Sequence, residues 1–292
     1  MCANTRPRFW RGSIPLQCRV MARGLPTEST FSNAGSVPDE CLTPARSASD
    51  LERVAPSRLT YHNTVGTTLT SDVTTIGFIG SGNIGGTVAR LAVAVGYDVV
   101  LSNSRGPQTL GDLVEQLGPG ARAAIPAEAA AAGDLVVVSI PPRAYLGVPV
   151  QPLAGKPVLD TMNYMPQRDG RIPGLYGGSL SSSEVLQRQL GSAHVVKVFN
   201  NITSWHLLSL ARPAGAADRS ALPIAGDNPA AKLALTRFLD AIGYDTVDAG
   251  ALGAGGRRFQ VGSHAWVAAY GALTNERGTP APVAAIRIAL GL

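Results

Sequence analysis

The chain has little of what several classes of protein depend on. Its three cysteines, Cys2, Cys18 and Cys41, all lie near the start of a 292-residue chain, so no thiol follows them. This excludes a disulfide framework, a cysteine-ligated zinc site and a cysteine nucleophile from the remainder. Only four histidines occur, and no Ser/His/Asp constellation or metal cluster can be recognised around them. We therefore expect no bound metal and assign no catalytic acid or base.

Charge and long apolar runs are also scarce. Charged residues make up 15% of the chain and the formal net charge is only +5. The arginines are scattered and form no run or helical stripe, so we expect no nucleic-acid partner. No segment has the roughly eighteen uninterrupted apolar residues that would suggest a membrane span, and we expect a cytoplasmic protein without membrane contact.

Residues 1–72 differ in composition from the rest. They are rich in Ser, Thr, Pro and Arg, show no sustained periodicity and contain no acidic residue before Glu28. Three interpretations stay open: an organelle transit peptide, a disordered leader, or a mis-assigned start with translation beginning at Val73. We favour the third, because Val73 would open the chain directly on its first strand.

From Thr75 onward, strand and helix patterns alternate, which predicts an α/β fold with a doubly wound parallel sheet, the Rossmann NAD(P)-binding fold. We assign residues 73–250 to this domain and residues 251–292 to a small C-terminal cap. Strands are expected at 75–80, 97–102, 134–142, 156–163, 193–200, 221–227 and 244–250. Helices are expected at 83–96, 107–117, 228–243 and 281–290.

The first strand leads into a glycine-rich turn of the form GxGxxG. It comprises Gly80, Ser81, Gly82, Asn83, Ile84 and Gly85. Because the turn follows a strand, opens a helix and leads to a second strand, it stands in the βαβ setting of a dinucleotide site. Gly80 permits the turn, Gly82 lets a pyrophosphate approach the backbone, and Gly85 allows close helix packing. Free amides at the helix start would bind the pyrophosphate.

The second strand ends without the acidic residue that often binds the ribose of NAD. In its place stand Ser102, Asn103, Ser104 and Arg105. A carboxylate here would repel a 2′-phosphate, whereas hydroxyls, an amide and a guanidinium can donate hydrogen bonds to it. The expected cofactor is therefore NADP(H).

The two motifs, together with the segment VVKVFNNITSWHLL, resemble a known family. These residues are similar to the NADP oxidoreductases that use coenzyme F420, a 5-deazaflavin, and to the related cytosolic domain of the STEAP metalloreductases. The resemblance extends over about residues 75–250. In two places the chain departs from the family pattern: Val198 replaces a small alanine, and Thr109 stands where a second basic residue is usual.

The resemblance implies where two cofactors would lie. The nicotinamide would run along the carboxyl ends of the strands near Ile140, Pro141 and Asn163, and a planar deazaflavin would stack near residues 198–205. Hydride would then pass directly between the two rings, so the protein would supply position and electrostatics. Substrate contacts would come from Val198, Asn200, Asn201 and Trp205.

Other interpretations of these residues stay open. Asn200 and Asn201 could hold a carboxamide or carbonyl, or could simply form a turn at a strand end. Trp205 could stack on a ligand or pack in the core, and we favour the core. Lys197 lies within an apolar strand, and we expect a structural role for it.

Two other functions compete with an F420-type oxidoreductase. An imine, pyrroline or β-hydroxyacid reductase shares the glycine turn but needs a long helical domain, for which the residues after Gly250 are too few. A non-catalytic NADPH sensor fits the lack of a proton donor equally well. We also expect a homodimer, because the apolar segment 264–273 lacks obvious cover in so short a tail.

Overall fold

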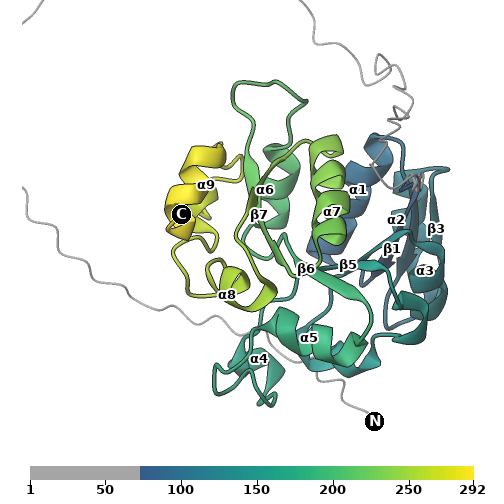
Figure 1. Cartoon of the computed structure of the whole chain (residues 1–292). Coiled ribbons are helices and arrows are strands. Elements are labelled where there is room, and N and C mark those ends of the chain that lie inside the picture. Colours follow the sequence, from purple (N-terminus) through teal and green to yellow (C-terminus); the bar gives the residue numbers. More distant parts are fainter. Residues whose placement is uncertain (1–72) are drawn as a thin grey trace, which may run out of the picture. The chain divides into compact units, whose positions relative to one another are not determined.

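The structure is a computed structural model and describes residues 73–292; the interpretations of residues 1–72 lie outside this range. Its centre is an eight-stranded sheet in the order β3-β2-β1-β4-β5-β6-β7-β8 (Figure 1). The strands are β1 (Thr75–Ile79), β2 (Asp98–Ser102), β3 (Ala121–Ala123), β4 (Leu135–Val138), β5 (Pro157–Asp160), β6 (His194–Lys197), β7 (Ala221–Gly226) and β8 (Asp245–Asp248).

Helices cover both faces of the sheet, as the alternation in sequence predicts. One face carries α1 (Asn83–Ala94), α2 (Gly111–Leu117), α6 (Ser204–Ser209), α7 (Pro229–Ala241) and α9 (Val283–Leu290). The opposite face carries α3 (Pro126–Ala132), α5 (Ser182–Leu190) and α8 (Leu252–Arg257). Side chains alternate between the faces along β1, since Phe78 belongs to the first core and Ile79 to the second. The α/β doubly wound fold is confirmed.

The sheet is parallel except at one junction. Strands β1 to β6 run in one direction, whereas β7 is antiparallel to β6 and pairs Gly226 with Val196. The connection between them carries α6, which is only six residues and therefore about 9 Å long. The chain then enters β7 from the edge at which β6 ends. The Rossmann unit thus comprises six strands, and β7 with β8 extends it.

The remaining short helices stand in the connections. Four are 3₁₀ turns, η1 (Pro107–Leu110), η2 (Pro142–Gly147), η3 (Gln151–Leu153) and η4 (Ala268–Tyr270), and one is the four-residue α4 (Pro166–Asp169). The expected helix 107–117 is thus η1 followed by α2. Periodicity did not indicate β3, which has only three residues, or α3, whose alanine-rich sequence has no amphipathic contrast.

The C-terminal residues pack into the same core as the sheet. Ile286 and Leu290 of α9 and the fully buried Tyr270 belong to the cluster that covers β7 and β8. The Tyr270 hydroxyl donates to the Ala221 carbonyl at 2.9 Å. Ala265 is also fully buried, so the two buried residues of the segment 264–273 are covered by their own chain, whereas Leu273 is exposed. The dimer therefore stays a prediction.

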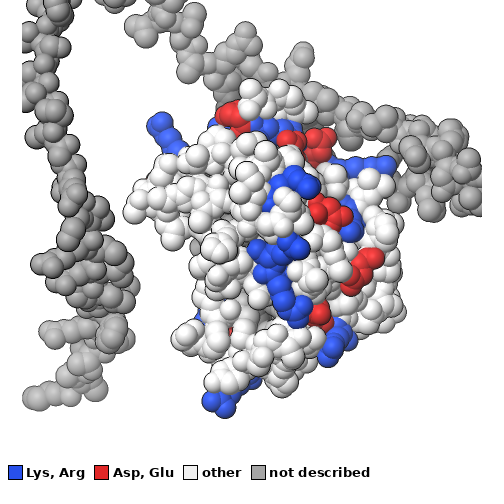
Figure 2. Space-filling model, turned by 60° about the vertical axis from the view of Figure 1, so that its left-hand side comes forward, with Lys and Arg blue, Asp and Glu red and all other residues white. Residues whose placement is uncertain are grey.

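On the surface, basic and acidic side chains are interspersed on the face that Figure 2 shows. The described residues include no helix long and apolar enough to cross a membrane. They also include no group of three or more His, Cys, Asp or Glu side chains placed to bind a metal ion.

Candidate functional site

The carboxyl ends of the parallel strands bring the predicted site residues to one edge of the sheet. Because β1 lies between β2 and β4, its end is the point at which the strand order reverses. Ligands of open α/β sheets bind in the crevice outside this switch point. The segments that meet there follow β1, β2, β4, β5 and β6.

The three glycines of the turn are required for different reasons. Gly80 has φ +100°, and a Cβ there would overlap the Ser139 carbonyl oxygen, which lies just beyond β4. At Gly85 a Cβ would overlap the Gly80 carbonyl oxygen, so α1 packs directly on the turn. Gly82 has an ordinary φ of −80°, and a Cβ there would meet no atom within 4 Å. Because Gly82 has no side chain, the space beside it is open, and no other described residue fills it.

The helix that begins beside this space has unpaired amides at its start. Helix α1 runs from Asn83 for twelve residues, with Gly82 as its N-cap and no side-chain cap. The amides of Asn83, Ile84 and Gly85 therefore lack the partners that a capping side chain would provide. Ser81, by contrast, donates to the Ser102 carbonyl at 2.9 Å and ties the turn to β2. Free amides and open space together fit a pyrophosphate.

Hydrogen bonds within the loop after β2 hold it in one conformation. The Asn103 side chain accepts from the Arg105 amide at 2.9 Å and donates to the Thr109 hydroxyl at 2.8 Å. Thr109 in turn donates to the Gly106 carbonyl at 2.8 Å. Ser104 and Arg105 are exposed, and the Arg105 guanidinium has no hydrogen-bond or ion-pair partner within residues 73–292. The loop thus presents a preorganised, free guanidinium.

Ser102 and Thr109 have structural contacts in this loop. The Ser102 side chain is fully buried and donates to the Phe78 carbonyl at 2.7 Å, so it joins β2 to β1. Thr109 stands at the position where the family usually has a second basic residue. Its hydroxyl accepts from Asn103 and donates to the Gly106 carbonyl, so it closes the loop. Of the four predicted phosphate ligands, Ser104 and Arg105 have exposed side chains, while Asn103 shapes the loop.

The segment after β4 forms the other wall of the switch point. Ile140 is half-buried and packs against the second core, while Pro141 is exposed and precedes η2. The Ile140 methyl Cγ2 lies 2.9 Å from where a Cβ on Gly80 would stand. Ile140 is therefore adjacent to the glycine turn, and the nicotinamide contact that the resemblance implied for Ile140 and Pro141 stays a prediction.

Two asparagines link the ends of β5 and β6. Asn163 donates through Nδ2 to the Asn200 carbonyl at 2.6 Å, and Asn200 donates to the Phe259 carbonyl at 2.8 Å. Only 2% of Asn200 is exposed, and its Oδ1 has no hydrogen-bond partner in the described structure. The preceding Phe199 has φ +61°, a left-handed conformation that is costly for an aromatic residue. A strained backbone and a free buried acceptor thus coincide at the end of β6.

The other tentative substrate residues do not all reach this edge. Val198 is fully buried in the core, and Asn201 donates to the Ala265 carbonyl at 3.1 Å, which anchors the C-terminal segment. Trp205 is 42% exposed on α6 beside the buried His206, so the prediction that it packs in the core is wrong. It remains available for stacking.

The sequence did not reveal a buried polar network at the ends of β5 and β6. Asp160 at the end of β5 and Lys197 at the end of β6 are fully buried neighbours in register, and both contact the fully buried Ser183 of α5. Burial raises the pKa of Asp160, against the effect of Lys197. It lowers the pKa of Lys197, against the effect of Asp160. The sequence signal was a charged residue at the end of each apolar strand.

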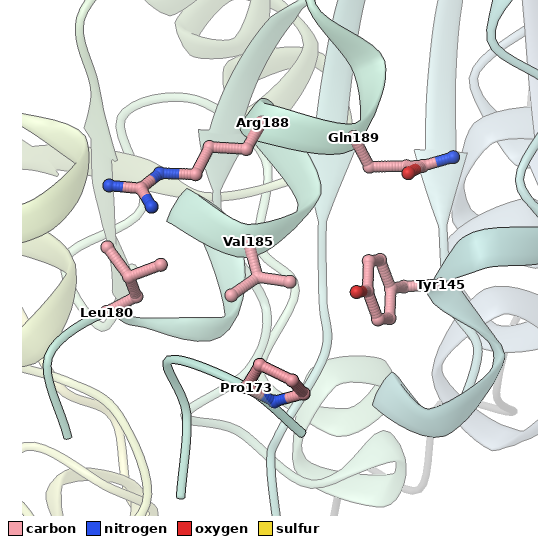
Figure 3. Close-up of a pocket in the computed structure, with 6 residues that line it drawn as sticks. All are labelled: Tyr145, Pro173, Leu180, Val185, Arg188 and Gln189. Atoms are coloured by element: carbon pink, nitrogen blue, oxygen red, sulfur yellow. The ribbon is translucent and has the colours of Figure 1, made fainter. Parts of the chain in front are cut away.

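A cavity of about 250 Å³ lies on the outer side of α5 (Figure 3). In the close-up, Val185 of α5 lies between Tyr145 of η2 and Leu180, and Arg188 extends from α5 toward the side of Leu180. The full lining is Tyr145, Pro173, Leu180, Val185, Arg188 and Gln189. None of these residues was predicted to bind the nucleotide.

Comparison with known proteins finds a family match over part of the chain. Residues 75–164 match the family described as "NADP oxidoreductase coenzyme F420-dependent". This range contains the glycine turn, the loop after β2 and Asn163. The match confirms the family resemblance over this segment and places it among NADP-dependent oxidoreductases. No curated protein matches the chain.

Two solved structures share the fold. A hypothetical protein from Sinorhizobium meliloti is 27% identical with a TM-score of 0.58, and the alignment covers 66% of this chain and 93% of that one. A protein from Arthrobacter sp. FB24, provisionally named an F420-dependent NADP reductase, is 25% identical with a TM-score of 0.53. That alignment covers 62% of this chain and 86% of the other.

Proposed function

We propose that the chain transfers hydride between NADP(H) and coenzyme F420 or a similar small conjugated acceptor, because residues 75–164 match the F420-dependent NADP oxidoreductase family. The observation that carries the proposal is the open space at Gly82, beside the uncapped start of α1. Nothing in the fold requires a glycine there, whereas a bound pyrophosphate does.

The NADP end of the site would be held by two groups of donors. The amides of Asn83, Ile84 and Gly85 face an anion together with the positive end of the α1 dipole. Arg105 would supply a charge-assisted hydrogen bond to the 2′-phosphate, with Ser104 beside it. Because Asn103 and Thr109 already fix this loop, little conformational entropy is lost when the phosphate binds.

The reacting end would be held at β4, β5 and β6. Ile140 and Pro141 would form an apolar wall beside the nicotinamide, which keeps water away from the reacting carbon. Asn200 Oδ1 has no partner among the described residues but is itself buried, so it would accept a hydrogen bond from a ring N–H or a carboxamide only after a local rearrangement. Trp205, exposed on α6, would offer an aromatic surface to a planar acceptor.

The proposed reaction places modest demands on the protein. NADPH would supply the hydride, the conjugated acceptor would take it, and the proton that completes the reduction would come from solvent. The side chains at the switch point then have to orient two rings and exclude water, for which no acid/base pair is needed. The neutral asparagines and the proline at this edge fit such a role.

Spectroscopy with purified protein tests the proposal in two steps. Titration with NADPH and NADH should give a clear preference for NADPH. Mixing the protein with NADPH and oxidised F420 should then bleach the absorbance of the oxidised deazaflavin. A preference for NADH would overturn the phosphate assignment. NADPH binding without reduction of F420 would instead favour a sensor or another acceptor.

A further inference from the structure

The buried network under the site consists of four side chains from three elements. Asp160 ends β5, Lys197 ends β6, and Ser182 and Ser183 stand in the first turn of α5. All four are at most 6% exposed. The Ser183 hydroxyl donates to Asp160 Oδ2 at 2.6 Å and accepts from Lys197 Nζ at 3.3 Å. Lys197 also donates to Ser182 at 3.2 Å. Ser183 thus stands between the two charges.

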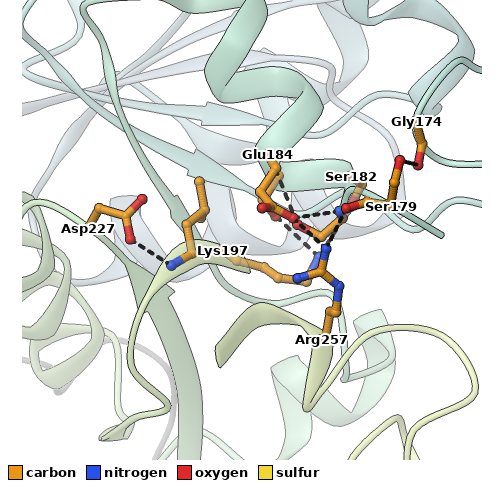
Figure 4. A network of polar contacts seen from close by, with 10 residues as sticks. Gly174, Ser179, Ser182, Glu184, Lys197, Asp227 and Arg257 are labelled. Carbon is orange, nitrogen blue, oxygen red and sulfur yellow. Dashed lines mark hydrogen bonds and ion pairs between the residues drawn. The ribbon is translucent and has the colours of Figure 1, made fainter. Parts of the chain in front are cut away.

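The surroundings keep Lys197 away from solvent. Helix α8 lies over it, since a Cβ on Gly256 would be 3.1 Å from Lys197 Cδ, and the Phe259 ring centroid lies 6.0 Å from Nζ. Figure 4 shows Lys197 beside Ser182, with the ion pair of Arg257 and Glu184 at the α5 end of the network. That pair joins α8 to α5 at 3.0 Å.

Stability alone does not account for such a network. Taking an ammonium and a carboxylate out of water is costly, and apolar residues of similar volume often serve a core equally well or better. Here Asp160 and Lys197 do not even form a direct ion pair within the described residues, because Ser183 bridges them. A buried network of this kind is more readily explained by the geometry that it imposes.

The geometry in question is that of the turn after β5. Asp160 Oδ1 accepts from the Met162 amide at 2.9 Å, and Ser182 donates to the Met162 carbonyl at 3.3 Å. Both backbone groups of Met162 are therefore fixed. Asn163 follows at once and donates to the Asn200 carbonyl. The network thus acts on Asn163 and Asn200 without facing the crevice itself.

We propose that Asp160, Ser183 and Lys197 form a positioning network that holds Asn163 and Asn200 in register for hydride transfer. This inference rests on the proposed function, because it assumes that the nicotinamide end lies at these asparagines. None of the three network residues touches the cofactor. Their effect is on the alignment of the reacting rings, so turnover should be far more sensitive to them than NADPH affinity, which the glycine turn and Arg105 determine.

The test replaces Ser183 by Ala, with Ser220→Ala as the matched control. Ser220 is also a fully buried serine, and its hydroxyl accepts from the Ala281 amide at 3.1 Å, remote in sequence from the network. For Ser183→Ala we expect kcat with NADPH and oxidised F420 to fall about 10- to 100-fold, as for a small misalignment. The Kd for NADPH should change less than about twofold, and Ser183→Thr should restore turnover. A Ser183→Ala enzyme no slower than the control would overturn the proposal.

A second readout separates this proposal from the proposed function. If the unaltered protein fails to reduce F420, the proposed acceptor is wrong. The positioning network is then tested by the fluorescence lifetime of bound NADPH, because this lifetime reports how firmly the nicotinamide is held. A shorter lifetime for Ser183→Ala at equal NADPH occupancy supports the network. Equal lifetimes in the unaltered protein, Ser183→Ala and Ser220→Ala reject it. Thermal unfolding of each variant identifies any that has failed to fold.

Discussion

Replacing Gly82 by alanine tests whether glycine is required at this position for folding stability or for binding of the nucleotide. The backbone at Gly82 has φ −80°, which alanine adopts freely, and the added methyl would meet no atom within 4 Å. Two small effects on stability oppose each other. Restricting the unfolded chain stabilises by about 0.4–1 kcal/mol. Loss of glycine at an N-cap costs about the same. We expect the free energy of unfolding to change by less than about 1 kcal/mol.

Binding of NADPH should respond very differently. The methyl would occupy the space beside the free amides of α1, where the pyrophosphate must come close to the backbone. A forced contact of this kind costs about 1–3 kcal/mol, which corresponds to a rise in Kd of about 5- to 150-fold. Urea denaturation would measure the stability, and a fluorescence titration would measure the NADPH affinity.

Gly86→Ala is the control, because Gly86 lies in the same helix and a Cβ there would come no closer than 3.9 Å to the Ser81 carbonyl oxygen. Alanine within a helix stabilises by about 1 kcal/mol, and NADPH affinity should not change. If Gly82→Ala bound NADPH as tightly as the unaltered protein, the pyrophosphate could not lie at this turn, and the main support for the proposed function would be lost.

Four further predictions concern side chains of the candidate site and of the buried network. Arg105→Ala should raise the Kd for NADPH about 10- to 150-fold by removing a charge-assisted hydrogen bond, and should leave NADH unaffected; Arg90→Ala, on the exposed side of α1, is the control in both titrations. Trp205→Ala should raise the KM for F420 about 2- to 10-fold at an unchanged Kd for NADPH, the expected size of a stacking contact in steady-state kinetics. Lys197→Met leaves the Asp160 carboxylate buried without its cation and should cost about 3–5 kcal/mol at pH 7 in urea denaturation, most of which Asp160→Asn should recover. Burial raises the pKa of Asp160 above its ordinary value of 3.8. Asp160 therefore favours folding most below pH 3.8, and this contribution is lost as the pH rises through the folded pKa. The free energy of unfolding of the double variant, relative to that of the unaltered protein, should accordingly increase as the pH rises from 3.8. A difference that stayed constant with pH would contradict a raised pKa for Asp160.

Much of the fold could be predicted because it depends on local patterns. The apolar strands and the amphipathic helix 228–243 are visible as periodicity, and the glycine turn has a spacing that few other structures need. The reversal of β7 could not be predicted, since antiparallel and parallel strands of a buried sheet have the same composition. Short, alanine-rich elements such as β3 and α3 carry too little contrast to be recognised.

The candidate site could also be predicted only in part. Gly80, Gly82 and Gly85 act through the backbone, which sequence spacing reports well. Ser102 was expected to bind the phosphate, but its side chain is buried and donates to the Phe78 carbonyl, because one residue of register decides on which face of a strand a side chain lies. Partners distant in sequence are harder still: nothing in the apolar strand around Lys197 shows that a serine of α5 stands against it.

The hydrogen bonds that reach from the end of β6 to the last part of the chain have a consequence for biosynthesis. Asn200 and Asn201 obtain their partners from Phe259 and Ala265, and the first residue of β7 pairs with Ala281. A nascent chain that has emerged only as far as β8 would therefore have a complete glycine turn but unsupported asparagines at the reacting end. The nucleotide half of the crevice could form early during synthesis, whereas the other half would mature only after the residues up to Ala281 have emerged from the ribosome.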